Sequence, residues 1–345
     1  MAVVVHHICH AIEHNAPHVM LPFSGWWAPL GAAGVDIFFV ISGFVIWFIA
    51  PSRPLAVSEQ VGFLKNRALR IYPLYLIFTA IAVLLFVFRE TRDQLTAQFV
   101  LCSALLIPTT NPFNGGFHPV LDQGWTLFYE GGFYLLFSVL LCFGPRYRLG
   151  ALAVVFGCLF GVAHLGSKLP VVAIWQDSII FEFTLGCLIA FTLQNGALPG
   201  GRSARWMVVA GVALLVMSAF CPPGWSRLFV WGIPSALLVA GLVGLEAAAV
   251  DGLRWCDRLV PLGDASYSLY LSHSMVTLVL GMLVKRGVVP TQQVPLILVA
   301  LCTAGLCIAV GLIAHRWIER PIMEFARRLN KPRPLLGPTA EATTA

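Results

Sequence analysis

The chain has 345 residues, of which 58% are hydrophobic and 11% are charged, and its mean hydropathy is +0.83. Soluble domains carry roughly 25% charged residues, so this composition excludes an ordinary soluble protein and is typical of a polytopic membrane protein. The net charge of +6 does not require a nucleic acid partner, because the basic residues lie between the apolar runs, where membrane topology uses them.

The first apolar run is unusually short. Residues 1–12 are apolar except for three histidines, and Glu13 and His14 then interrupt the run. A full crossing needs ~20 residues. We therefore expect either a helix that continues through polar residues or a natural gene product that begins further upstream. No cleavable signal pattern precedes the run.

Histidines crowd this first segment. His6, His10 and His14 are spaced by four residues, so they share one face of a helix. A metal site is one interpretation, but histidine clusters alone are weak evidence and no second cluster with ligand spacing is visible, so we predict no metal. An imidazole that titrates near neutrality can instead act as a general base. A third interpretation is that the histidines line the membrane interface.

The second apolar run, residues 34–50, carries Asp36 near its start and Ser42 and Gly43 in its middle. A carboxylate in a membrane helix costs free energy unless it is paired or hydrated, so Asp36 is a candidate functional residue. The alternative is that Asp36 only caps the N-terminus of the helix. Gly43 predicts a close contact with another helix.

Eight later runs are also expected to cross the membrane. They are residues 73–88, 125–143, 149–166, 172–193, 206–221, 228–249, 266–284 and 293–317. Residues 60–72 and 254–264 are expected to lie at the membrane surface, because they mix apolar and basic residues. Residues 95–107 form a shorter apolar stretch that ends at Pro108.

The basic residues decide whether residues 95–107 cross. If they do not, the loops alternate so that 16 of the 22 basic residues lie on one side, which identifies that side as cytoplasmic. A crossing at residues 95–107 would remove the asymmetry. We therefore predict an all-α bundle of about ten transmembrane helices, both termini cytoplasmic, and a re-entrant or interfacial segment at residues 95–107. Residues 1–330 would form one membrane domain, and the Pro-rich residues 331–345 a loose tail.

Two arginines stand at the cytoplasmic mouth of the third predicted crossing. Arg67 and Arg70 are three residues apart, which places both guanidinium groups on one helix face. Paired arginines suit phosphate groups, because each can bind bidentately. The alternative interpretation is an anchor that binds anionic lipid.

Further polar residues lie inside predicted crossings. Glu130 follows Trp125, which we expect in the interfacial aromatic belt, and Glu130 needs a partner such as a histidine or an arginine. Glu182 is another intramembrane acid without a clear partner. Tyr270 and His273 are three residues apart, and this spacing favours a buried hydrogen-bonded pair.

Four segments, in this order, resemble signatures of the acyltransferase-3 family of integral membrane acyltransferases, and best its bacterial exopolysaccharide-modifying subgroup. The segment Gly34-Val-Asp-Ile-Phe-Phe-Val-Ile-Ser-Gly-Phe resembles G-V-D-x-F-F-V-x-S-G-F, and Phe63-Leu-Lys-Asn-Arg-Ala-Leu-Arg-Ile-Tyr-Pro-Leu-Tyr resembles F-x-x-x-R-x-x-R-I-x-P-x-Y. The segment Trp125-Thr-Leu-Phe-Tyr-Glu with the following Phe-Tyr-Leu resembles W-x-L-x-x-E-x-x-F-Y-L, and Ser266-Tyr-Ser-Leu-Tyr-Leu-Ser-His resembles S-Y-x-x-Y-L-x-H.

The chain departs from the family at its N-terminus. The stretch Val3-Val-Val-His-His resembles the family's A-x-x-V-V-x-x-H and places His7 at the catalytic histidine. Aligning His10 instead would place His6 where the family has an apolar residue, and the choice between His7 and His10 stays open. The family's arginine, ten residues before the histidine, would fall before Met1. We therefore expect that the natural product starts upstream or that this chain is inactive as it stands.

The resemblance implies transfer of an acyl group, usually acetyl, from acyl-CoA as co-substrate to a carbohydrate hydroxyl at the bacterial inner membrane. His7 would be the general base, and Asp36 or Glu130 would orient or charge-stabilise its ring. Arg67 and Arg70 would hold the CoA phosphates. The substrate tunnel would be shaped by Ser42, Trp125, Tyr134, Tyr270 and His273.

The expected partners are a lipid-linked carbohydrate acceptor, membrane lipids and polysaccharide-assembly proteins, with no nucleic acid. The rival class is a proton-coupled transporter or flippase of glycans or small molecules, because intramembrane acids and histidines also form proton relays. An inverted repeat would favour the transporter, and none is visible. A sensor or scaffold, with the acids joining helices, is a third class.

Overall fold

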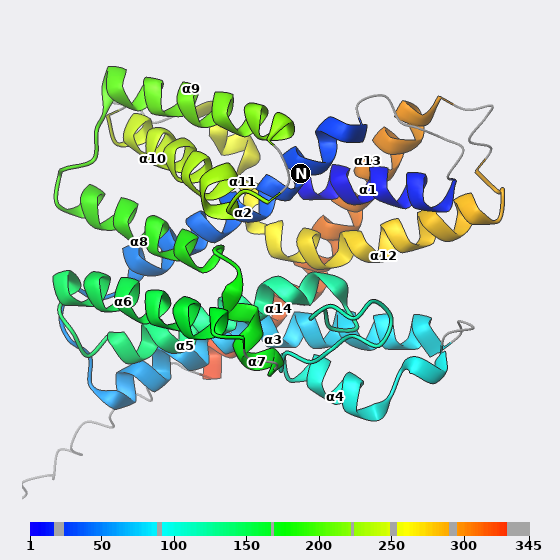
Figure 1. Ribbon diagram of the computed structural model, residues 1–345, viewed down its shortest axis with the longest axis horizontal. Coiled ribbons are helices and arrows are strands. Elements are labelled where there is room, and N and C mark those ends of the chain that lie inside the picture. The colour runs from blue at the N-terminus through cyan, green and yellow to red at the C-terminus, as the bar shows by residue number, and fades with distance from the viewer. Residues whose placement is uncertain are drawn as a thin grey trace, which may run out of the picture.

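The computed structural model describes residues 1–16, 24–87, 92–166, 169–221, 224–248, 254–289 and 295–329. Within these ranges every regular element is helical, which confirms the predicted all-α class. The predicted tail, residues 331–345, lies outside the described residues. Figure 1 shows the helices from α1 in blue to α14 in red.

The α-helices follow one another along the chain from the N-terminal α1 to α14. They are α1 (Ala2–Asn15), α2 (Ser24–Ile49), α3 (Val57–Val87), α4 (Ala97–Ala104), α5 (Trp125–Leu140), α6 (Pro145–His164), α7 (Pro170–Ala173), α8 (Ile180–Gln194), α9 (Gly201–Met217), α10 (Ile233–Ala248), α11 (Val260–Asp264), α12 (Ser266–Lys285), α13 (Leu296–Ala314) and α14 (Arg320–Leu329).

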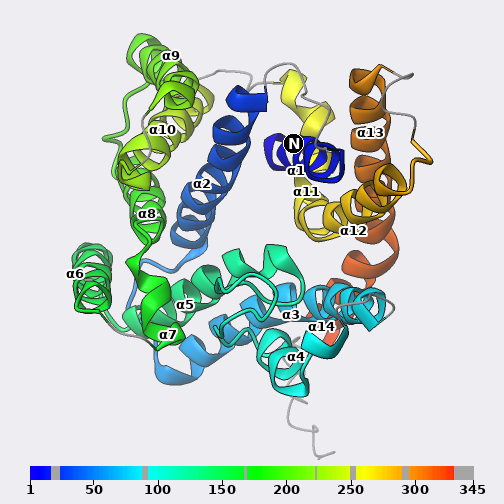
Figure 2. The same ribbon diagram turned by 45° about the vertical axis from the view of Figure 1, so that its right-hand side comes forward.

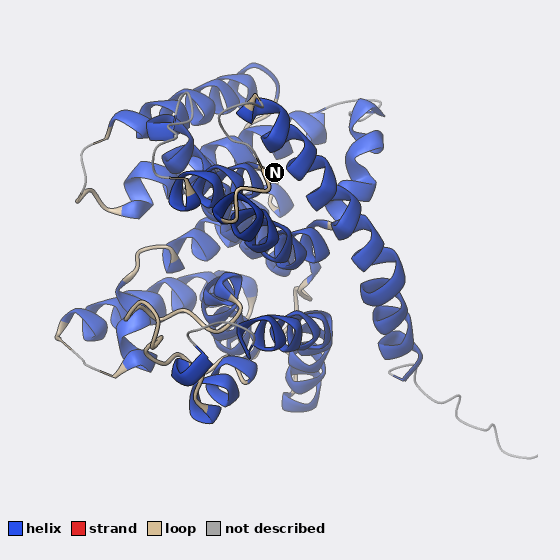
Figure 3. Cartoon of the chain, turned by 90° about the vertical axis from the view of Figure 1, so that its right-hand side faces the viewer, coloured by secondary structure: helices blue, strands red, loops and turns tan. Residues whose placement is uncertain are grey.

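The helices form two groups. Helix α2 packs on α8, α9 packs on α10, α1 lies between α2 and α12, and α12 packs on α13. Figure 2 shows these helices above α3, α5, α4 and α14, and Figure 3, turned by 90° from Figure 1, shows that the described elements are helices joined by loops. Large apolar side chains such as Val209 on α9 and Leu301 on α13 are exposed. Exposed apolar faces of this kind suit a lipid environment.

The membrane-spanning helices agree with the hydropathy pattern. Among the described residues, seven helices are long and apolar enough to cross a membrane, and the bent pair of residues 170–176 and 180–194 makes an eighth. The two other predicted crossings correspond to α1 and α5, with 14 and 16 residues. At 1.5 Å per residue these helices measure about 21 and 24 Å, less than the ~30 Å hydrocarbon core.

Residues 95–107 do not form a crossing helix, as predicted. Their helix, α4, has only eight residues, or about 12 Å. Two tyrosines of α3 hold its C-terminal end: the Tyr72 hydroxyl donates to the Leu105 carbonyl at 3.0 Å, and the Tyr75 hydroxyl to the Ser103 carbonyl at 2.7 Å. The short helix is thereby tied to the side of α3.

Residues 60–72, the predicted surface piece, do not form a separate element, and their place at the membrane surface stays a prediction. These residues form the first half of α3, one helix of 31 residues that continues through Pro73. A helix satisfies its backbone hydrogen bonds internally in both water and lipid, so the change from polar to apolar sequence does not end it. Residues 254–264 do form short pieces, the 3₁₀ turn Arg254–Leu259 and α11.

The predicted close contact at Gly43 is confirmed. A Cβ at Gly43 would lie 2.1 Å from the Phe183 carbonyl oxygen, and one at Gly186 would lie 2.0 Å from the Val40 carbonyl oxygen. The two glycines therefore allow the backbones of α2 and α8 to touch. This contact brings the acid of α2, Asp36, near the acid of α8, Glu182.

Candidate active site

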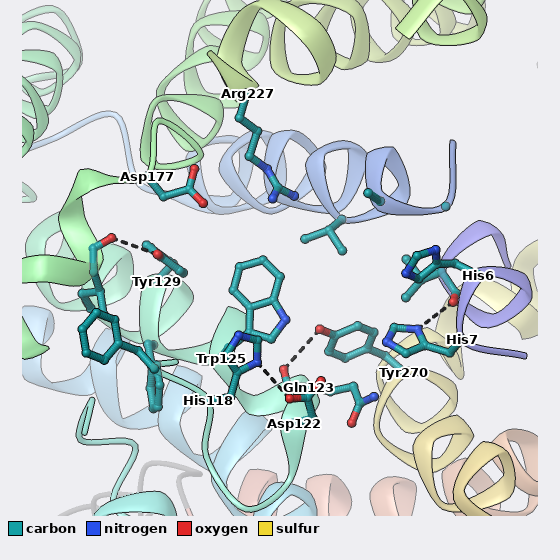
Figure 4. Close-up of a pocket in the computed structure, with 17 residues that line it drawn as sticks. His6, His7, His118, Asp122, Gln123, Trp125, Tyr129, Asp177, Arg227 and Tyr270 are labelled. Atoms are coloured by element: carbon teal, nitrogen blue, oxygen red, sulfur yellow. Dashed lines mark hydrogen bonds and ion pairs between the residues drawn. The ribbon is translucent and has the colours of Figure 1, made fainter. Parts of the chain in front are cut away.

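A cavity of about 450 Å³ lies where α1, α2, α5 and α12 come together. Its walls combine histidines, aromatic rings and charged side chains (Figure 4). The site residues predicted from the sequence that line it are His7, Trp125 and Tyr270. Ser42, Tyr134 and His273 do not line it, although all three are buried nearby or within the same helices.

One ring nitrogen of His7 is free to accept a proton. Its Nδ1 lies 2.8 Å from the Val3 carbonyl oxygen, one helical turn back along α1. A carbonyl only accepts, so Nδ1 carries the hydrogen and Nε2 carries the lone pair. His7 is thus in the tautomer whose Nε2 can take a proton from a hydroxyl.

His273 packs directly against His7. The two rings meet edge to face with their centroids 5.0 Å apart. His273 is completely buried, its Nδ1 lies 3.2 Å from the Leu269 carbonyl, and its Nε2 has no hydrogen-bond partner in the described part of the chain. His273 therefore supports the face of His7 that packs into the protein.

Tyr270 and His273 touch, but they do not form the predicted hydrogen bond. Their ring centroids are 5.8 Å apart. The Tyr270 hydroxyl instead lies 2.9 Å from the Thr126 hydroxyl and 3.2 Å from the Gln123 carbonyl, at the start of α5. Tyr270 therefore ties α12 to α5 at the floor of the cavity.

Asp36 has a partner that sequence reasoning did not identify. Both of its carboxylate oxygens accept from Arg227, at 2.8 Å from Nε and 2.9 Å from Nη2. Asp36 is completely buried, and its position 12 residues inside α2 excludes a role as N-terminal cap. The Arg227 guanidinium lies over the rings of Trp125 and Trp231, at 5.7 and 5.2 Å from their centroids.

Glu182 stands beside this ion pair. It is fully buried, and its nearest charged neighbours are Asp36, Arg227 and Asp177. Glu182 therefore belongs to the charged cluster around Arg227. The sequence did not reveal this cluster, because Arg227 comes from the segment between α9 and α10. A single arginine between two tryptophans, Trp225 and Trp231, was the available signal.

Glu130 pairs within its own helix. The Tyr134 hydroxyl, one turn further along α5, donates to the Glu130 carboxylate. Arg67 and Arg70 of α3 are the basic residues that act on this pair electrostatically, with Arg67 half-buried and Arg70 exposed. The structure thus brings Glu130, Tyr134, Arg67 and Arg70 together.

The predicted residues therefore fall into two groups rather than one. Neither Asp36 nor Glu130 bonds to His7 in the described part of the chain: Asp36 binds Arg227, and Glu130 binds Tyr134. Helix α5 joins the groups, because Trp125 lines the cavity and Tyr134 lies nine residues, or about 14 Å, further along. The orienting role of either acid stays a prediction.

The carboxylate that acts on His7 is Asp122, which also lines the cavity. Asp122 forms an ion pair with His118, with 2.8 Å between Nδ1 and Oδ1. This hydrogen bond raises the pKa of His118. Burial is the largest single effect on Asp122 and opposes its ionisation, but the bond from His118 and the charges of His118, His7 and His10 together outweigh it and lower the pKa of Asp122.

This ion pair predicts a pH-dependent stability. The raised pKa of His118 stabilises the fold below the unfolded value of about 6.5, and this contribution is lost as pH rises through the folded value. The lowered pKa of Asp122 stabilises the fold above the unfolded pKa of about 3.9, and this contribution is lost as pH falls through the folded pKa. The pair therefore acts most strongly near pH 5–6.

We expect His118→Gln to lower the melting temperature more at pH 6 than at pH 9. The effect should correspond to about 1 kcal/mol or less, because the two side chains are 37% and 55% exposed. Thermal unfolding of the purified protein in detergent at both pH values measures it. His14→Gln, which removes an exposed histidine, is the control, and an equal loss at both pH values for His118→Gln would contradict the prediction.

The described residues contain no group of three or more His, Cys, Asp or Glu that could hold a metal ion. The side chains of the site offer general-base, hydrogen-bonding and electrostatic chemistry. A base at Nε2 of His7, a polar cavity and a separate arginine pair suit proton removal from a bound hydroxyl.

Comparison with known proteins gives matches along nearly the whole chain. The family model Acyl_transf_3, described as an acyltransferase domain, matches residues 1–314. The exopolysaccharide production protein ExoZ of Rhizobium meliloti is 32% identical over 352 residues, which cover 96% of this chain and 99% of ExoZ. Acyltransferase MdmB of Streptomyces mycarofaciens is 28% identical and matches 91% of this chain and 86% of MdmB. The O-acetyltransferase OatA of Staphylococcus aureus is 26% identical over 86% of this chain and 53% of OatA. No solved structure matches significantly.

Proposed function

We propose that this chain, which belongs to the acyltransferase-3 family and is therefore a membrane acyltransferase, moves an acyl group from acyl-CoA to a carbohydrate hydroxyl. Acetyl is the expected group, and the acceptor would be an exopolysaccharide or its lipid-linked precursor. The name of ExoZ, an exopolysaccharide production protein, and that of OatA, an O-acetyltransferase, support this choice.

The observation that carries the proposal is the state of His7. Its Nδ1 is committed to the Val3 carbonyl, and its ring lines a cavity of about 450 Å³. Pockets of this size accommodate small ligands. An acceptor hydroxyl in this cavity could therefore reach a basic nitrogen that has no competing bond within its own helix.

The reaction follows from this base. Nε2 of His7 takes the proton of the acceptor hydroxyl while the hydroxyl oxygen attacks the thioester carbonyl carbon. The carbon–sulfur bond breaks, and the CoA thiolate leaves with the proton from His7. The nearby Asp122 carboxylate favours the imidazolium that forms in between.

The donor would approach from the side of Arg67 and Arg70. Guanidinium groups bind phosphate oxygens by paired, charge-assisted hydrogen bonds, and the CoA portion carries several phosphates. Glu130 and Tyr134 lie between these arginines and the first turn of α5. They would line the path along which the acyl end reaches the cavity.

The proposed location is the bacterial inner membrane, with both termini in the cytoplasm. The distribution of basic residues supports this orientation. Arg67 and Arg70 would then face the cytoplasm, which contains acyl-CoA, and the loop before Trp125 would lie on the outer side. Polysaccharide-assembly proteins are proposed as partners because they would supply the acceptor.

Purified protein incubated with acetyl-CoA labelled in the acetyl group tests the function, with a lipid extract of glycan-producing bacterial membranes as acceptor. We expect label in the glycan fraction and an equal amount of free CoA. The rival transporter or flippase would instead move glycan across proteoliposomes without releasing CoA. Absence of both label transfer and CoA release would contradict the acyltransferase proposal for this chain.

The arginine pair gives a separate prediction. Arg67→Ala should raise the KM for acetyl-CoA about tenfold or more, because it removes charge-assisted bonds worth about 1.5–3 kcal/mol. The KM for the acceptor should change little. Steady-state kinetics with each substrate varied measures both values, and Lys65→Ala, an exposed residue on the same helix, is the control. An unchanged KM for acetyl-CoA would contradict the assignment.

A further inference from the structure

A second cavity, of about 490 Å³, adjoins the cavity of His7. Five residues line both cavities and are called the shared wall below: Phe117, Tyr129, Ile174, Asp177 and Arg227. Figure 4 shows Asp177 and Arg227 at the edge of the first cavity that faces away from His7. A ligand longer than one small ring could therefore extend from the first cavity past these residues into the second.

The second cavity has aromatic and hydrogen-bonding walls. The rings of Phe160 and His164 lie against each other at the end of α6, tilted by 44° and with their centroids 4.2 Å apart. Gln176 also lines this cavity, and its side-chain nitrogen donates to the Ala163 carbonyl at 2.7 Å. Ring faces together with a few fixed polar groups suit a ligand that has both apolar ring faces and hydroxyls.

The charges at the shared wall disfavour an anionic ligand. The positive charge of Arg227 is already matched by Asp36, which binds it bidentately. Asp177 adds a further carboxylate, and one of its oxygens accepts from the Ile179 backbone at 3.0 Å. The titratable side chains that line this cavity are Tyr129, His164, Asp177 and Arg227. Because Asp36 matches Arg227 and the Tyr129 phenol is neutral, the wall carries excess negative charge when His164 is neutral. A uronate or phosphate would be repelled here.

We propose that the second cavity is a subsite for a neutral sugar unit, adjacent in the acceptor to the unit whose hydroxyl meets His7. This inference rests on the proposed function and specifies its acceptor as an uncharged saccharide of at least two units. Asp177 and Gln176 accept from and donate to hydroxyls of the second unit, and the aromatic rings cover its faces. Binding of the second sugar unit, which does not react, would thereby determine which hydroxyl of the first unit is acylated.

The test compares soluble methyl glycosides in the same assay as the proposed function. The acceptors are neutral mono- and disaccharides of gluco, galacto and manno configuration, together with disaccharides whose second unit is a uronate. We expect at least one neutral disaccharide to show kcat/KM about tenfold or more above its monosaccharide, and its uronate form to lose that advantage.

Two variants connect this preference to the cavity. Ala173→Trp fills the second cavity and should reduce kcat/KM for the disaccharide to that of the monosaccharide, which keeps its own value. Val171→Trp places the same bulk at an exposed position of α7 that lines neither cavity, and should change nothing. Asp177→Asn, which can still accept from Ile179, should reduce discrimination against the uronate.

Several results would overturn the inference. These are equal kcat/KM for mono- and disaccharides in the unmodified protein, a disaccharide advantage that survives Ala173→Trp, and failure of every neutral disaccharide to accept label or to inhibit labelling of the membrane glycan. If the membrane glycan is labelled in the same preparation, such a result refutes only the subsite. If no glycan is labelled at all, the proposed function fails and the subsite fails with it.

Discussion

Replacing His7 by alanine should lower the rate of acyl transfer by about 10²–10⁴-fold, the contribution of a positioned general base. The variant should stay folded, because His7 is only partly buried and its bond to Val3 lies within one helix. The measurement is the rate of label transfer from acetyl-CoA to glycan at saturating concentrations of both substrates. The melting temperature in detergent, compared with that of the unmodified protein, reports on folding.

His10 provides the matched control, because it lies on the same helix, is exposed, and is the alternative candidate for the base. His10→Ala should keep the rate within a few-fold of the unmodified protein. His7→Gln retains a polar side chain but no base, so it should be as slow as His7→Ala. A normal rate in His7→Ala, or a comparable loss in His10→Ala, would show that His7 is not the base.

Replacing Asp36 by alanine should destabilise the fold by about 3–5 kcal/mol, because it leaves the guanidinium of Arg227 in a largely buried site without its carboxylate. The rings of Trp125 and Trp231 cannot replace two charge-assisted hydrogen bonds. Reversible unfolding of the purified protein by denaturant in mixed micelles gives the change in free energy.

A double-mutant cycle separates the ion pair from the packing around it. Asp36→Asn combined with Arg227→Gln should destabilise less than the sum of the single changes, since the second change removes the unpaired charge that the first one leaves. The pair formed by Arg53 and Glu59 is the exposed control, and its loss should destabilise the fold far less, because solvent screens the two charges. Additive single effects, or similar costs for the two pairs, would contradict this view of Asp36.

The two groups of predicted site residues give α5 a central place in the proposed mechanism. One end of this helix, with Trp125, meets the cavity of His7, and its middle, with Glu130 and Tyr134, meets the arginines. A helix of 16 residues is too short to cross the hydrocarbon core by itself. The loop before it, which carries His118 and Asp122, therefore reaches into the protein and forms part of the site.

Local features of the molecule could be predicted from the sequence. The apolar runs identify the helices, because hydropathy and length are properties of one segment at a time. The division of basic residues among the loops, which is also read directly from the sequence, indicates that residues 95–107 do not cross. Gly43 is identifiable as a close contact for the same reason: in a membrane helix only a small residue lets two backbones touch. The spacing of Arg67 and Arg70 likewise places both on one face of α3.

The partners of the buried charges depended on the tertiary structure. The sequence indicates that Asp36 needs a partner, but Arg227 is 191 residues away and resembles an ordinary loop cation. Glu130 is expected to meet a histidine or an arginine, and it binds Tyr134, one turn away on its own helix. His7 lies beside His273 and near Asp122 only because α1 packs between α2 and α12. The sequence by itself determined which side chains could not stay unpaired in lipid, since that cost belongs to each group. Which groups meet was decided by the packing of helix faces, because a partner is chosen by the geometry of two surfaces that no single segment contains.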